Sequence, residues 1–221
     1  MSKSNAFSAV IFDFGGVFTT SPVSQFLVFE QENNLPDMFI GSVIKKDHHT
    51  NAWAKIERSE INIDQFDEMF AEETKAAGFE ISGRTLVGLL KLQFYPAMIE
   101  TLSRIKLAGF KTGCITNNVP EIDSNAMLEE SAENQKTLAS IFSNFDEIIE
   151  SSKIGMRKPE PRIYELMCTK LNVTPTKCIF IDDLGINLKP AQAMGMTTIK
   201  APLGDISPAI DQLNSYLGLM K

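Results

Sequence analysis

The sequence AVIFDFGGVFTT, residues 9–20, decides the fold of this chain. Four apolar residues lead into Asp13, and two glycines, Gly15 and Gly16, follow almost at once. An apolar run of this length is typical of a strand that is buried on both faces of a parallel sheet. An unpaired buried carboxylate is costly, and glycines allow the backbone to approach a ligand closely. We therefore predict a strand over residues 9–12, with Asp13 at its carboxyl end and facing a site. On this stretch alone, an aspartate in an ordinary turn is the alternative.

Composition and charge narrow the class of partner. The chain has 221 residues, is 43% hydrophobic and carries a formal net charge of -7. An acidic balance argues against nucleic acid or an anionic membrane as a partner, although a local cationic pocket can still bind an anionic small molecule. No apolar run is long enough to span a membrane, and a charged residue interrupts the apolar region that would form a signal peptide. Three cysteines lie in apolar surroundings, so we expect them to be buried and reduced in a cytoplasmic protein: Cys114, Cys168 and Cys178.

Strand and helix patterns alternate along most of the chain. Further apolar runs predict strands near residues 110–118, 145–150, 177–181 and 197–200. Helical patterns lie over 96–107, 162–171 and 207–217, and another helix follows Asp183 and ends before Gly195. Residues 151–161 are predicted to be a loop, and residues 119–137 an exposed acidic excursion with a helix from about residue 124. This alternation predicts an α/β fold, a doubly wound parallel sheet of the Rossmann-like type.

Residues 21–95 interrupt this alternation with helical patterns alone. Helices are predicted over 24–32, 63–77 and 82–92, with Asn62 and Ser82 as N-caps. A helical block between two parts of an α/β chain is typical of an inserted domain. We predict an α/β core of residues 1–20 and 96–221 with a helical cap of residues 21–95.

Polar residues follow three of the predicted strands. They are Asp13, then Thr116 and Asn117, then Asp182 and Asp183, and Lys158 lies in the loop that precedes the last of these strands. Ligands of an open parallel sheet bind outside the carboxyl ends of its strands, so we expect these residues to share one crevice.

This set suits phosphoryl transfer through an aspartyl phosphate on Asp13. Asp13, Asp183 and the Gly15 carbonyl would bind Mg²⁺, with Asp182 as a close second. Thr116 and Asn117 would bind phosphate oxygens, and Lys158 would neutralise the phosphate and the nucleophile.

These residues resemble the motifs of the haloacid dehalogenase superfamily of hydrolases, in the same chain order. The resemblance covers essentially the whole chain and implies a subclass I helical cap, Mg²⁺ as cofactor and a small-molecule phosphate ester as substrate. Two stretches, GMRKP at residues 155–159 and FIDDLGINLK at residues 180–189, are similar to the phosphatase-type domain of soluble epoxide hydrolases and of acyl-CoA dehydrogenase-related proteins.

One position departs from the family pattern, in which an aspartate two residues after the nucleophile acts as general acid and base. Here that position is Gly15, and loss of a positioned acid costs roughly 10²–10⁴-fold in rate. The first hypothesis is a phosphatase for substrates whose leaving group needs little protonation. The second is a 2-haloacid dehalogenase, which would not need the acid pair Asp182 and Asp183. The third is a weakly catalytic binding or regulatory protein on the same fold.

Other polar and aromatic residues have two readings each. Trp53 either lines the substrate site or packs between cap helices, and His48 with His49 indicate an exposed loop more than a metal site. Asn187 could orient Asp183 or simply begin a helix, and Arg157 could bind phosphate or form a surface salt bridge. A homodimer stays open, because cap helices often carry an outer apolar stripe.

Overall fold

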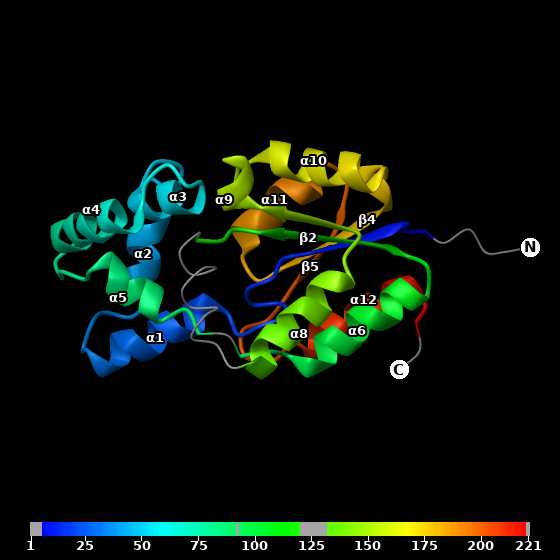
Figure 1. Ribbon diagram of the computed structural model, residues 1–221, viewed down its shortest axis with the longest axis horizontal. Helices are drawn as coiled ribbons and strands as arrows, with labels where there is room; N and C mark the ends of the chain where they lie inside the picture. Colours follow the sequence, from blue (N-terminus) through cyan, green and yellow to red (C-terminus); the bar gives the residue numbers. More distant parts are fainter. Residues whose placement is uncertain (1–5, 92, 120–131, 220–221) are drawn as a thin grey trace, which may run out of the picture.

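A five-stranded parallel sheet forms the centre of the computed structural model, which describes residues 6–91, 93–119 and 132–219 (Figure 1). The strands lie in the order β3-β2-β1-β4-β5. Their bounds are β1 Ala9–Phe12, β2 Lys111–Thr116, β3 Glu147–Glu150, β4 Cys178–Asp182 and β5 Thr197–Lys200. All paired neighbours are parallel, which confirms the predicted doubly wound sheet.

Helices cover both faces of the sheet (Figure 1). One layer consists of α6 Pro96–Leu107, α8 Ala132–Ser143 and α12 Ser207–Leu217, and the other of α10 Pro161–Leu171 and α11 Gly185–Ala193. The side chains of β1 alternate between the two layers: Val10 and Phe12 pack in the first, Ala9 and Ile11 in the second. All four residues are fully buried, as the apolar run predicts. A short 3-10 helix, η2 Pro175–Lys177, precedes β4.

Five helices, which we call the cap helices, lie together at the end of the sheet where β1 and β2 end (Figure 1). They are α1 Pro22–Glu32, α2 Phe39–Lys45, α3 Ala52–Glu57, α4 Ile63–Ala76 and α5 Gly83–Gly88. They pack around an apolar cluster of their own, in which Trp53 contacts Phe26 and Phe66 edge to face. Trp53 therefore packs between cap helices. The division into a core of 1–20 and 96–221 and a cap of 21–95 stays a prediction.

The predicted caps are present, but some helix bounds differ. Asn62 forms a capping box with Gln65, and Ser82 accepts a hydrogen bond from the backbone of Thr85. Helix α5 ends at Gly88, earlier than the predicted residue 92, because the backbone N–H groups of Leu89 and Leu90 donate to carbonyls three residues back rather than four.

Three short helices were not predicted. For α2 the reason lies outside the segment, since its first turn is capped by the carboxylate of Glu30, which accepts from the backbone of Met38 and Ile40 at 2.8 Å each. Helix α3 has only six residues, too few for a clear period. The prediction of a loop over 151–161 was wrong at its start, where α9 Ser151–Ile154 forms and ends at Gly155 in the left-handed region. The predicted helix start near residue 124 lies outside the described residues.

Two expectations from composition can be compared with the structure. The three cysteines are buried and form no disulfide. In the described ranges, no helix combines the length and apolarity that crossing a membrane requires.

Candidate active site

The predicted residues converge where the strand order reverses direction. From β1 the chain moves outward through β2 and β3 and then returns to β4 on the other side of β1. The backbone N–H of Asp13 donates to the carbonyl of Ile181 at 2.8 Å, so Asp13 lies beside Asp182 and Asp183. Such a reversal is where ligands bind in open α/β sheets.

Three carboxylates form a tight cluster at this point. Asp13, Asp182 and Asp183 each have an oxygen within 4.8 Å of the others, and all three side chains are buried. Burial, followed by the charge of Asp182, raises the pKa of Asp13 well above its usual value. The same two causes raise the pKa of Asp183 to about 6. The cluster therefore favours a bound cation, which would relieve this repulsion.

Lys158 lies between two of the carboxylates. Its Nζ is 2.5 Å from Oδ1 of Asp13 and 2.8 Å from Oδ2 of Asp182, and the side chain is 1% exposed. Burial alone lowers the pKa of Lys158, but Asp13 and Asp182 raise it above the ordinary value, so the ammonium group stays charged.

Asp182 is held by several donors at once. Its Oδ1 accepts from the backbone of Leu184 at 2.8 Å, and the amide of Asn187 lies 3.1 Å from each carboxylate oxygen. Asn187 was predicted either to orient Asp183 or simply to begin a helix, and its amide binds Asp182 rather than Asp183. The reason is that α11 begins at Gly185 and places Asn187 in its first turn, below the end of β4.

Two residues of the loop between β1 and α1, Ser21 and Gly16, hold Asp183 in place. Its Oδ2 accepts from the hydroxyl of Ser21 at 2.5 Å, and Ser21 also caps α1. Gly16 has φ +75°, and a Cβ there would lie 2.4 Å from Cγ of Asp183. Gly16 is thus required both for its backbone angle and for the close approach of the carboxylate. The sequence reading missed Ser21, although its N-cap type marked it as a helix start.

Thr116 and Asn117 lie where the neighbouring strand β2 ends. Thr116 is the last residue of β2. Phe12 of β1 pairs with Cys114 of β2, so the residue opposite Asp13 is Ile115, and Thr116 comes one residue later. The Asn117 amide binds the backbone of Lys158 in both directions: its oxygen accepts from the N–H at 2.9 Å, and its nitrogen donates to the carbonyl at 3.0 Å. In this structure Asn117 holds the lysine loop.

Gly15 differs from its neighbour. An added Cβ would lie 3.6 Å from Cδ of Pro22, an ordinary contact, and its φ lies outside the left-handed region. No steric reason therefore requires a glycine at this position.

A cap carboxylate that the sequence reading missed enters the site from α3. Nε of Arg157 lies 2.5 Å from Oε2 of Glu57, and both side chains are buried. Arg157 was predicted to bind phosphate or to form a surface salt bridge, and the surface salt bridge was wrong, because the cap helices cover the residue.

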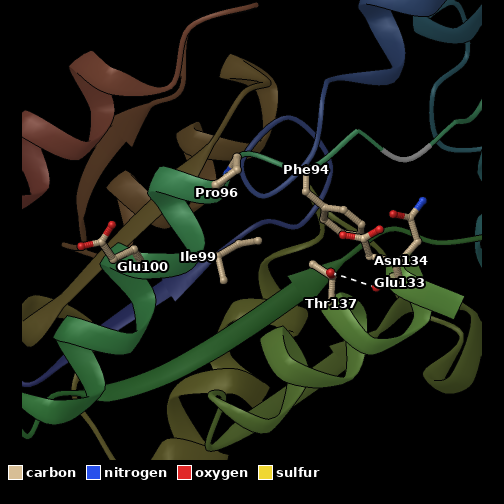
Figure 2. A pocket seen from close by; sticks show the side chains of 7 residues that line it. All are labelled: Phe94, Pro96, Ile99, Glu100, Glu133, Asn134 and Thr137. Atoms are coloured by element: carbon tan, nitrogen blue, oxygen red, sulfur yellow. Dashed lines mark hydrogen bonds between the residues drawn. The ribbon is translucent and has the colours of Figure 1, made fainter. Parts of the chain in front are cut away.

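The structure also has a shallow groove of about 470 Å³ away from these residues, between α6 and α8 (Figure 2). Phe94, Pro96 and Ile99 form its apolar side, and Glu133 and Thr137 lie opposite. Its lining includes no member of the carboxylate cluster.

A buried carboxylate cluster and a lysine at the reversal point of a doubly wound sheet are features of α/β enzymes with an acidic catalytic centre. The chain belongs to the haloacid dehalogenase-like hydrolases, whose family model matches residues 7–195. This confirms the resemblance drawn from the motifs.

Several relatives match most of the chain. It is 29% identical to acyl-CoA dehydrogenase family member 10 of Mus musculus over 98% of this chain, and 29% identical to bifunctional epoxide hydrolase 2 of Sus scrofa over 97%. The chain spans only 20% and 39% of the length of these two proteins. It is 30% identical to a sesquiterpene phosphatase of Aspergillus oryzae, over 86% of this chain and 87% of that protein.

A solved structure shows the same fold. It is a haloacid dehalogenase family enzyme of Bacteroides thetaiotaomicron in complex with magnesium and inorganic phosphate. The two share 18% identity with a TM-score of 0.60, over 90% of this chain and 96% of the other.

Proposed function

We propose that this chain is a Mg²⁺-dependent phosphatase of small-molecule phosphate esters, with Asp13 as the nucleophile. The observation that carries the proposal is the pairing of Asp13 and Asp182 through Lys158, beside a third buried carboxylate. Phosphoryl transfer needs a nucleophile and neutralisation of the transferring charge, and this cluster offers both.

The carboxylate cluster fits a hard cation. Among the residues that the structure describes, Lys158 is the cation that pairs with this cluster, and it contacts two of the three carboxylates, so the cluster is short of positive charge. Oxygen ligands of this kind suit Mg²⁺. Asp13, Asp183 and the Gly15 carbonyl would hold it, and Asp182, whose oxygens already accept from Lys158 and Asn187, is the weaker candidate. When bound, Mg²⁺ would offset charge on the phosphoryl group.

The chain's own residues then perform two displacements. Both contacts of the Asp13 carboxylate, with Lys158 and with the N–H of Phe14, are at Oδ1, so we assign the attack on phosphorus to Oδ2. The ester P–O bond breaks as the new one forms, and the leaving oxygen takes its proton from water. Water then attacks the phosphorus of the aspartyl phosphate, which regenerates the carboxylate and releases inorganic phosphate. Thr116 and Lys158 bind the phosphate oxygens in both steps.

Gly15 restricts the substrate. Without a carboxyl group two residues after Asp13, the leaving group receives no proton from that position. We therefore infer that the enzyme works best on esters whose leaving group is stable as an anion, such as anomeric, aryl or acyl phosphates.

Two features of the relatives and the site favour phosphate over halide chemistry. The sesquiterpene phosphatase matches 86% of this chain, whereas a relative named (S)-2-haloacid dehalogenase matches 55%. In addition, Asp183 is buried and held by Ser21 at a position that a metal-free displacement at carbon does not need.

The test is phosphate release from a panel of phosphomonoesters, with Mg²⁺ or with EDTA. We expect Mg²⁺-dependent turnover that Asp13→Asn lowers by roughly 10³–10⁶-fold, while Asp37→Asn, an exposed carboxylate on the cap side, has no effect. A phosphoryl group should be trapped on the peptide that contains Asp13. Halide release from chloroacetate in EDTA, without phosphate release from any ester, would contradict the proposal.

A further inference from the structure

The carboxylate of Glu57 joins the cap helices to the loop that carries Lys158. Glu57 is the last residue of α3 and is 4% exposed. Its Oε2 lies 2.5 Å from Nε of Arg157 and 3.4 Å from the amide nitrogen of Asn117. Helix α3 lies beside α9, immediately before the lysine loop (Figure 1).

Both partners of Glu57 are attached directly to Lys158. Arg157 precedes it in the chain, and the Asn117 amide binds its backbone N–H and carbonyl at 2.9 and 3.0 Å. The Lys158 Nζ in turn contacts Asp13 and Asp182. A continuous path of polar contacts therefore runs from the cap to the carboxylate cluster.

Stability alone is a poor reason for this arrangement. Burial raises the pKa of the Glu57 carboxyl, and the Arg157 guanidinium only opposes that rise. Burying two charges costs desolvation free energy, and an apolar pair often packs as well. The charged pair instead fixes how Arg157 and Glu57 are oriented, because a guanidinium and a carboxylate bind in a defined relative geometry. Arg157 has a second hold on the cap, since its Nη1 donates to the carbonyl of His48 at 2.7 Å.

We propose that Glu57 is a positioning residue, which places Lys158 against Asp13 when the cap helices lie against the core. The inference rests on the proposed role of Lys158 in phosphoryl transfer. Displacing a group by about 1 Å can cost roughly 10²-fold in rate, so loss of this hold should be felt in turnover.

The experiment compares Glu57→Gln with Ser59→Ala. The hydroxyl of Ser59 donates to the carbonyl of Ser152 at 2.8 Å, a contact between cap and core that does not touch Lys158 or its partners. It is therefore a matched control for a loosened cap. Two readouts are used: steady-state kinetics on an activated phosphate ester, and the rate at which Lys158 is acylated by an N-hydroxysuccinimide ester, followed by peptide mass spectrometry.

In Glu57→Gln we expect kcat to fall about 10–100-fold with KM within about threefold, and Lys158 acylation to become at least about tenfold faster. The exposed Lys75 should be labelled equally in all variants, which controls for the reactivity of the reagent. Ser59→Ala should match the wild type in both readouts. Unchanged kcat and unchanged acylation in a folded Glu57→Gln variant would overturn the inference.

A double variant covers the case in which Glu57→Gln fails to fold because it leaves Arg157 charged and unpaired. Glu57→Gln with Arg157→Gln removes both charges, and we expect the same loss of kcat and the same gain in acylation. Wild-type kcat in this variant would refute the inference. Faster Lys158 acylation in a chain that releases no phosphate would refute the proposed function and leave the positioning role standing.

Discussion

Gly15→Asp is the most informative single substitution, because the structure has room for it. An added Cβ would lie 3.6 Å from Cδ and 3.9 Å from Cγ of Pro22, which is ordinary contact, and φ at Gly15 is not in the left-handed region. Gly15 follows Asp13 by two residues, so the new carboxyl group would start beside the nucleophile. The backbone carbonyl of Gly15, proposed as a metal ligand, would be unchanged.

The expected gain follows from the value of a general acid. A positioned acid contributes roughly 10²–10⁴-fold, or about 2.7–5.4 kcal/mol of transition-state stabilisation. The gain should appear in full for an alkyl phosphate, whose leaving group needs a proton, and should be much smaller for p-nitrophenyl phosphate. Proximity to the three carboxylates would raise the pKa of the new group, which helps it to hold a proton near neutral pH.

The assay is the ratio of kcat/KM for the alkyl ester to that for p-nitrophenyl phosphate, at fixed Mg²⁺. Gly15→Asn is the control, because it has the same size but no carboxyl proton to donate. A rise of the ratio in Gly15→Asp alone would support the reasoning. An unchanged ratio in a folded variant, or an equal rise in Gly15→Asn, would refute it.

Two further substitutions test the neighbouring residues. Gly16→Ala should lower the free energy of unfolding by about 1–3 kcal/mol, because φ at this residue is +75° and the new Cβ would lie 2.4 Å from Cγ of Asp183. The substitution should also weaken the stabilisation that Mg²⁺ gives in thermal unfolding. Wild-type stability of the variant would contradict the steric argument. Without metal, stability should fall as pH rises from about 4 to 6, because the Asp183 pKa is raised from 3.8 to about 6 and the unfolded chain loses that proton first. The free energy of unfolding should fall by on the order of 3 kcal/mol over this range, as measured by urea denaturation. The fall should be smaller in Asp183→Asn, and Mg²⁺ should offset it in the wild type.

The sheet and the carboxylate cluster could be predicted because their signals are local. The two strands that are buried along their whole length, β1 and β4, are marked by apolar runs, and an aspartate directly follows each run in the sequence. Parallel strands end at the same edge of a sheet, so the sequence predicts that Asp13 and Asp182 lie close together. The sequence does not show which hydrogen-bond donor binds which of the two adjacent aspartates. The amide of Asn187 binds Asp182 rather than Asp183.

The contacts between cap and core could not be predicted, because they join residues far apart in the chain. Ser21 binds Asp183 across 162 positions, and Arg157 binds Glu57 across 100. Arginine is usually a surface residue, and the guanidinium group of Arg157 is buried because α3 packs over it. Helix α2 is a milder case, since its cap comes from Glu30 in the preceding helix.

The two adjacent glycines show why residue type alone did not separate geometry from chemistry. Gly16 is constrained by its backbone angle and by the Asp183 carboxylate against it, so any side chain there would displace a proposed metal ligand. Gly15 has neither constraint, so the fold has room there for the Cβ of the aspartate that the family pattern places two residues after the nucleophile. Packing gives no reason for the missing acid. Under the proposed function the reason lies in the reaction, because a carboxyl group there would assist a basic leaving group and would be unnecessary for a stable anion. On the same proposal, Glu57 acts through Arg157 and Asn117 on the placement of the lysine that would bind the phosphate.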